Sequence, residues 1–151
     1  MWNFKKSIIL SIAVCFIIGI MLTFAAVAMP EMISWYFKTV HAMNAPLVLY
    51  KVVITCFYIC LPFAYLALFC LLKVLFAIKR EEIFVNSNIT MLRILSWCCF
   101  AVALITLIGG RTYYPLLLIA AAAGFIGIIL RVIKNIMCSA KLLREENDLT
   151  I

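Results

Sequence analysis

The sequence predicts an all-α integral membrane protein with four transmembrane helices and a C-terminal amphipathic cytoplasmic helix. Hydrophobic residues make up 68% of the 151 residues and charged residues 13%, whereas soluble domains are about 45 to 50% apolar and about 25% charged. Four uncharged stretches approach or reach the length that a helix needs to cross a bilayer core of roughly 30 Å. Basic residues flank these stretches, as expected of membrane spans.

The first predicted span covers residues 7–28 and follows Lys5 and Lys6. Residues 26–28 (Ala-Val-Ala) have the form of a signal cleavage site, but the uncharged run is longer than the roughly 7 to 15 residues of a signal's apolar region. We therefore expect an uncleaved helix. The aromatic-rich connection, 31–50, is predicted to form a short interfacial helix at the level of the lipid headgroups.

The second predicted span covers residues 52–72 and lies between Lys51 and Lys73. Its uncharged run matches the thickness of the bilayer core. Pro62 stands at its middle and removes the hydrogen bond to the carbonyl of Tyr58, which predicts a kink. The aromatic side chains around the kink either pack against another helix or line a small pocket, and the sequence leaves both alternatives open.

The third and fourth predicted spans cover residues 92–110 and 113–130, with a tight outer turn between them. The fourth span has small residues at helical spacing near its centre, namely Ala120, Ala123, Gly124 and Gly127. Small residues let helix backbones approach closely in lipid. We expect this face to pack on another span, either within the chain or in a homo-oligomer.

Residues 131–151 are predicted to leave the membrane as an amphipathic helix. One stripe is apolar and comprises Ile129, Ile133, Ile136, Ala140 and Leu143; a second is largely basic and comprises Arg131, Lys134, Cys138 and Lys141. Such a helix lies on anionic lipid or against another helix. The whole chain, 1–151, is then a single membrane domain.

The distribution of basic residues predicts the topology. Of the 13 Lys and Arg residues, Lys38, Lys51 and Arg111 lie on one side of the predicted spans, and the others lie on the opposite side. Because cytoplasmic loops carry the excess of Lys and Arg, both termini and the connection at 73–93 are expected in the cytoplasm. We therefore expect the net charge of +7 to reflect basic residues that flank the spans and face anionic lipid. Direct nucleic acid binding is not expected.

The sequence contains no recognisable catalytic, metal-binding or cofactor-binding motif. No carboxylate, lysine or histidine stands at the middle of a predicted span, where proton relays and ion pathways place one. Cys70, Cys98 and Cys99 are expected at similar depth and are interpreted as apolar packing residues, with a redox or soft-metal site as the alternative. We therefore expect a protein that is not an enzyme.

Two short motifs carry a resemblance to a known family. Phe84, Asn88, Leu92 and Arg93, together with the ending at 146–151 (ENDLTI), resemble the YoaS-like family of uncharacterised small four-span bacterial membrane proteins. Genes of such families typically lie beside a small helix-turn-helix transcription regulator, so the resemblance implies a regulatory role at the plasma membrane.

These observations predict a non-enzymatic regulatory or scaffold protein that acts with a cytoplasmic partner, such as that regulator. The candidate partner contacts are residues of the two motif regions and the tail: Phe84, Asn88, Arg93, Lys141, Glu146, Asn147 and Asp148. Exposed polar residues of loops and tails are better candidates for binding than core residues. The alternative is a transporter accessory or small permease-like protein that works through the kink at Pro62.

Overall fold

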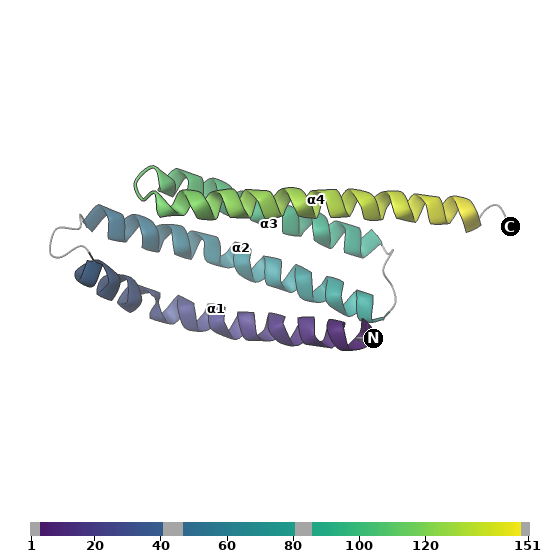
Figure 1. The fold of residues 1–151 in the computed structure, drawn as a ribbon, viewed down its shortest axis with the longest axis horizontal. Helices are drawn as coiled ribbons and strands as arrows, with labels where there is room; N and C mark the ends of the chain where they lie inside the picture. Colours follow the sequence, from purple (N-terminus) through teal and green to yellow (C-terminus); the bar gives the residue numbers. More distant parts are fainter. Residues whose placement is uncertain (1–3, 41–46, 81–85, 149–151) are drawn as a thin grey trace.

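A computed structural model describes residues 4–40, 47–80 and 86–148, and it is entirely helical over these ranges apart from two short turns. The four helices are α1 (Phe4–Val40), α2 (Leu47–Lys79), α3 (Asn86–Gly110) and α4 (Pro115–Asp148). They run antiparallel to one another along the chain (Figure 1). Phe84 lies outside the described residues.

Each helix packs on its neighbour in sequence. α1 packs on α2, α2 on α3, and α3 on α4, and the last of these contacts is the most extensive. Among the described residues, no other two helices approach closely along their backbones. The helices therefore form an open row, and α4 continues past the start of α3 (Figure 1).

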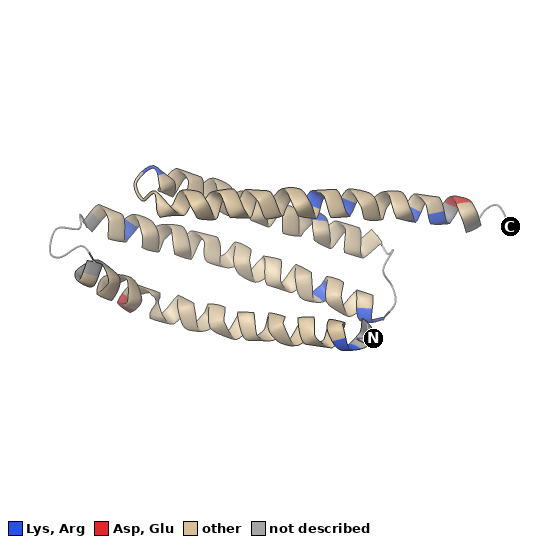
Figure 2. Ribbon diagram, viewed as in Figure 1, with Lys and Arg blue, Asp and Glu red and all other residues tan. Residues whose placement is uncertain are grey.

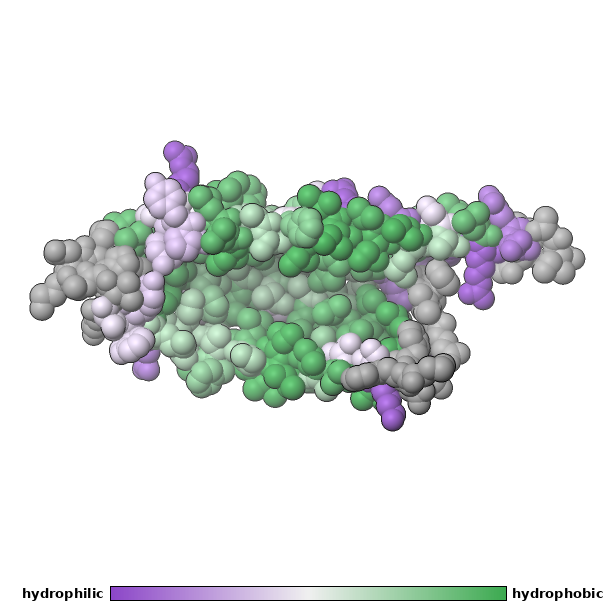
Figure 3. All heavy atoms as spheres, viewed as in Figure 1, coloured by the Kyte–Doolittle hydropathy of each residue, from purple (hydrophilic) through white to green (hydrophobic). Residues whose placement is uncertain are grey.

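All four helices are long and apolar enough to cross a membrane. The row leaves large apolar side chains uncovered, for example Val27 with 82% of its surface exposed and Leu118 with 77%. Figure 3 shows apolar residues over the middle of the molecule and hydrophilic residues toward its two ends. A large exposed apolar band with polar ends is the distribution that a bilayer requires.

The structure corrects several predicted boundaries. α1 does not stop at residue 28 but continues through Pro30 to Val40, so residues 31–40 of the expected interfacial segment continue α1 and residues 47–50 begin α2. The dark blue end of α1 is set at an angle to the rest of that helix (Figure 1). α4 is likewise one continuous helix, and its C-terminal part is not a separate amphipathic helix.

A hydrogen bond between α1 and α2 compensates for a proline. Pro30 has no backbone N–H, so the carbonyl of Ala26, one turn earlier, loses its helical donor. The hydroxyl of Tyr58 on α2 donates to this carbonyl at 2.9 Å. An unpaired carbonyl in an apolar environment costs several kcal/mol, so Tyr58 both satisfies Ala26 and fixes the register of α1 against α2.

α2 and α3 approach most closely at Gly109. A methyl group at Gly109 would lie 2.5 Å from Sγ of Cys56 and 2.9 Å from Cδ1 of Leu116, far inside contact distance. The thiol of Cys56 also faces the carbonyl oxygen of Ile105 at 4.0 Å, a weak hydrogen bond. Glycine is therefore required here so that α2 and the start of α4 can pack against the end of α3.

The small-residue face of α4 lies against α3. A methyl group at Gly127 would lie 3.2 Å from the Phe100 ring, and one at Gly124 would lie 3.9 Å from Cβ of Ala103. Ala120 is buried and Ala123 is half-buried. Gly124 and Gly127 thus lie at the contact between α4 and α3.

The turn between α3 and α4 is tight. Thr112 and Tyr113 both donate their backbone N–H to the carbonyl of Gly109 at 3.1 Å, and Pro115 begins α4. This confirms the turn predicted from the Gly-Gly pair and Pro115. The side chain of Tyr36 on α1 forms a hydrogen bond with that of Tyr113, so α1 also touches the outer turn.

Replacing Tyr58 by Phe removes the donor to Ala26 while keeping the ring. Because the carbonyl of Ala26 then has no partner in an apolar environment, we expect the protein to lose about 1 to 2 kcal/mol of stability. The measurement is the unfolding free energy of the purified protein in detergent. Tyr65→Phe on the same helix is the matched control, because the Tyr65 hydroxyl makes no hydrogen bond to a described residue.

The same Tyr58→Phe change in a Pro30→Ala background tests whether the Tyr58 hydroxyl acts through the carbonyl of Ala26. Alanine at position 30 restores the backbone N–H that the carbonyl of Ala26 lacks. Tyr58→Phe should then cost clearly less than it does in the wild-type background. An equal cost in both backgrounds would show that the hydroxyl does not act through this carbonyl.

Gly109→Ala tests the packing of α2 on α3. The new methyl group would overlap with Sγ of Cys56, so we expect a loss of about 1 to 3 kcal/mol in unfolding free energy. Gly124→Ala is the control, because its methyl group would make an ordinary contact and alanine favours the helix by about 1 kcal/mol. Adding Cys56→Ala should recover part of the loss at Gly109, and no recovery would contradict the proposed overlap.

Candidate functional site

A polar recess, here called the basic pocket, lies between α3 and α4. Its volume is about 330 Å³. Its lining consists of Arg93, Ser96 and Trp97 from α3 and Arg131 and Lys134 from α4. Figure 2 shows that basic positions of α4 begin about halfway along that helix, where it lies against α3. The pocket therefore gathers three cations from two helices at one place.

Helix geometry explains why these residues meet. Arg93 lies nearly as far before Gly110, the end of α3, as Arg131 lies after Pro115, the start of α4. At about 1.5 Å per residue, both arginines stand about 25 Å from the outer turn. Two antiparallel helices that leave a tight turn must therefore bring Arg93 and Arg131 to the same level.

Internal interactions hold the walls of the pocket in place. The hydroxyl of Ser96, which is buried, donates to the carbonyl of Gly127 at 2.9 Å and joins α3 to α4. The guanidinium of Arg131 lies 5.6 Å from the centre of the Trp97 ring, a cation–π contact. Nζ of Lys134 donates to Oδ1 of Asn135 at 2.9 Å, a neutral partner that leaves the lysine charge in place.

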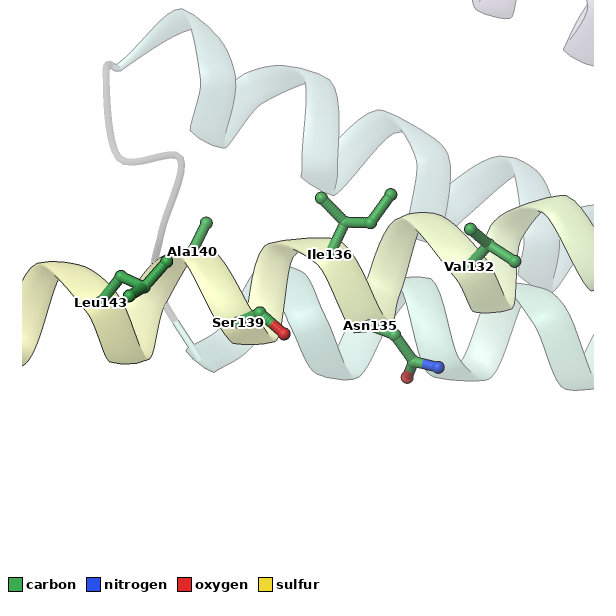
Figure 4. Close-up of a pocket in the computed structure, with 6 residues that line it drawn as sticks. All are labelled: Val132, Asn135, Ile136, Ser139, Ala140 and Leu143. Atoms are coloured by element: carbon green, nitrogen blue, oxygen red, sulfur yellow. The ribbon is translucent and has the colours of Figure 1, made fainter.

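A second surface lies on the C-terminal half of α4. An open groove of about 420 Å³ is lined by Val132, Asn135, Ile136, Ser139, Ala140 and Leu143. Val132, Ile136 and Ala140 project to the same side of the helix (Figure 4). Ile136 and Leu143 are more than half exposed. This groove is an apolar stripe on one helix with two polar side chains beside it.

The structure separates the residues that were predicted to contact a partner. Lys141 donates to Oδ1 of Asn86 at 2.7 Å and ties α4 to the first residue of α3. Glu146 and Asn147 are exposed near the end of α4, which reaches Asp148. Arg93 belongs to the basic pocket instead.

Asn88, another predicted partner contact, is buried. The side chain of Asn88 is 3% exposed, so it has almost no surface to offer a partner in this structure, and its assignment as a partner contact stays a prediction. A buried asparagine contributes by satisfying hydrogen bonds inside the protein. Phe84 and residues 149–151 lie outside the described residues.

The cysteines pack as apolar residues in the described structure. All seven are free thiols. Cys70 of α2 and Cys98 of α3 are buried and lie close enough to influence one another electrostatically. Within the described ranges, however, no group of His, Cys, Asp and Glu side chains has the arrangement of a metal site. Cys15, Cys70 and Cys98 are the buried thiols among them.

A third recess lies near the outer end, between α2 and α3. It measures about 450 Å³, is mostly apolar, and includes Lys51, Cys56 and Gly109 in its lining. Pro62 and Tyr58 are not among the residues that line it. α2 continues through Pro62 as one helix, and Tyr58 faces α1. The side chain of Tyr58 is thus packed against α1.

Several residues of the basic pocket were not predicted as site residues. The sequence placed Ser96 and Trp97 within the third predicted span, and it placed Arg131 and Lys134 in the basic stripe of the tail. The signal that identifies the pocket is the nearly equal distance of Arg93 and Arg131 from the outer turn.

The fold and these surfaces define a four-helix protein with four candidate membrane spans and two distinct surfaces away from the outer turn, one basic and one apolar. Residues 27–151 match the family model described as "Protein of unknown function (DUF2975)", and the chain belongs to this uncharacterised family. No curated protein matches the chain. No solved structure matches it either.

Proposed function

We propose that this chain is a bacterial plasma-membrane protein that crosses the bilayer four times and holds a soluble partner on the C-terminal half of α4. Both termini lie in the cytoplasm in this proposal. The protein is a non-enzymatic regulatory or scaffold protein. The resemblance to the YoaS-like family favours a small helix-turn-helix transcription regulator as the partner.

The length of α4 is the observation that carries the proposal. Its 34 residues give about 51 Å of helix, roughly 20 Å more than a bilayer core. A helix that begins at the outer turn with Pro115 therefore extends into the cytoplasm at its C-terminal end. This extension is connected rigidly to the membrane part, because α4 is continuous.

The surface of the extension has the form that a partner helix requires. Ile136, Ala140 and Leu143 recur at spacings of four and three and line one groove. An amphipathic helix that carries apolar residues at this spacing can lay that face against a groove or helix of a partner. The hydrogen bond from Lys141 to Asn86 fixes the extension against α3, so a change in the packing of α3 and α4 would reorient the groove.

The alternative, a transporter accessory or small permease-like protein, depends on the region of Pro62. The side chain of Tyr58, one turn before Pro62, is engaged with the carbonyl of Ala26 on α1. No pocket described above includes Pro62. A change of solute flux in Pro62→Ala, with transcription unaffected, would favour this alternative.

Site-specific crosslinking tests the partner proposal. A photoreactive amino acid at Ile136 lies in the groove, whereas one at Leu118 lies on the exposed apolar surface within the candidate span. We expect the Ile136 variant to crosslink in cells to a small DNA-binding protein, and the Leu118 variant to crosslink to lipid or to nothing. The adduct should disappear when Ile136→Asp is combined with a crosslinker at Leu143.

A truncated chain provides the second comparison. A chain that ends at Ala140 loses Leu143 and the acidic end of α4 while it keeps all four candidate spans in large part. It should still reach the membrane and should no longer retain the regulator. Transcription of the regulator's target genes should change in the truncated strain. Recovery of the same partner with both chains would refute the assignment to α4.

A further inference from the structure

The basic pocket carries positive charge that its own lining does not neutralise. Arg93, Arg131 and Lys134 line it, and the described lining includes no carboxylate. The acidic residues of α4 begin only at Glu145, about 17 Å beyond Lys134 along the helix. Glu31 is on α1, whose backbone packs on α2 and not on α3 or α4 in the described structure, and whose side-chain contact at Tyr36 is with Tyr113 in the turn, far from the pocket. Glu81 and Glu82 lie outside the described residues.

The chemistry of the lining fits a phosphate group. Arginine presents a planar fork of N–H donors that matches phosphate oxygens, and Lys134 adds a further cation. The contact with the Trp97 ring holds the Arg131 guanidinium beside the pocket. The Ser96 hydroxyl is already used in its bond to Gly127, so the cations rather than the serine are the donors available to an anion.

An apolar track leads away from the pocket along α3. Leu104 and Ile108 follow Trp97 by about two and about three helical turns, so all three lie on the same face of the helix. Trp97 is 59% exposed, Leu104 60% and Ile108 64%. The track is about 16 Å long. A free phosphate ion would make no use of it, whereas the acyl chain of a lipid would cover it.

The depth of the pocket agrees with a lipid headgroup. Arg93 and Arg131 stand about 25 Å from the outer turn, which is close to the far boundary of a bilayer core of about 30 Å. Trp97 is a residue of the type enriched at membrane interfaces. Basic pockets between membrane helices on the cytoplasmic side are suited to anionic headgroups.

We propose that Arg93, Arg131 and Lys134 bind the phosphate group of an anionic phospholipid of the cytoplasmic leaflet, whose acyl chain lies along Trp97, Leu104 and Ile108. The site lies across the most extensive helix contact of the molecule, that between α3 and α4. A bound lipid therefore stabilises the arrangement from which the α4 extension projects. The inference rests on the proposed membrane topology but not on the proposed soluble partner.

Native mass spectrometry of the full chain in detergent tests this site, with phosphatidylglycerol, phosphatidylcholine and inorganic phosphate added separately. We expect the wild type to retain phosphatidylglycerol in preference to phosphatidylcholine. Arg93→Gln/Arg131→Gln should weaken phosphatidylglycerol binding by about thirtyfold, because each basic residue near an anionic headgroup contributes about fivefold. The matched control is Lys73→Gln/Lys79→Gln, which removes two cations of α2 outside the pocket and should have a much smaller effect.

The double variant Arg93→Lys/Arg131→Lys keeps both positive charges. It provides a second test of the site if the glutamine variant does not fold. It loses the planar forks, so phosphatidylglycerol should bind it more weakly than the wild type and should raise its unfolding temperature less. Equal retention of the two lipids by the wild type would overturn the proposal. So would unchanged binding in both arginine variants, or displacement of phosphatidylglycerol by inorganic phosphate. If the Ile136 variant failed to crosslink to a partner, the soluble-partner proposal would fall, but the lipid-binding result would stand.

Discussion

Backbone hydrogen bonding is the constraint on which the rest of this structure depends. An apolar chain in hydrocarbon has no water to pair its N–H and C=O groups, so each segment must satisfy them as a helix. The structure departs from this rule at Pro30 within α1 and at Pro62 within α2, and at the first of these the hydroxyl of Tyr58 pairs with the carbonyl of Ala26. Pro30 thereby becomes the position at which α1 is attached to α2.

Small residues and polar side chains determine how the four helices form a row. Helices in lipid gain little from hydrophobic burial against one another, so close backbone approach and hydrogen bonds between helices decide their packing. Gly109 allows the approach of Cys56 at the α2–α3 contact, and Gly127 allows that of Phe100 at the α3–α4 contact. Ser96 adds its bond to the carbonyl of Gly127. The contact between α3 and α4 also positions the basic pocket and the groove of α4.

The sequence predicted the four helices because length and charge determine them directly, and the outer turn because Gly-Gly and Pro are strong local signals. It did not predict how far the helices continue. The aromatic-rich connection after residue 30 and the polar residues after residue 130 indicated boundaries, but α1 continues through Pro30, where Tyr58 pairs the freed carbonyl, and α4 is continuous. The basic pocket was missed because Arg93 and Arg131 are far apart in sequence, and only the antiparallel pairing of α3 and α4 brings them together. The burial of Asn88 was not predicted, because polarity alone does not distinguish a buried asparagine from an exposed one.

The orientation of the chain in the membrane tests the central claim most directly, because both proposed surfaces require the C-terminal half of α4 to lie in the cytoplasm. Green fluorescent protein and alkaline phosphatase can be fused separately after Ile151 and after Thr112, which lies in the outer turn. The account predicts fluorescence and no phosphatase activity for the fusions at Ile151. It predicts the reverse for those at Thr112. Phosphatase activity after Ile151 would place the groove and the basic pocket on the outer side and would contradict the account.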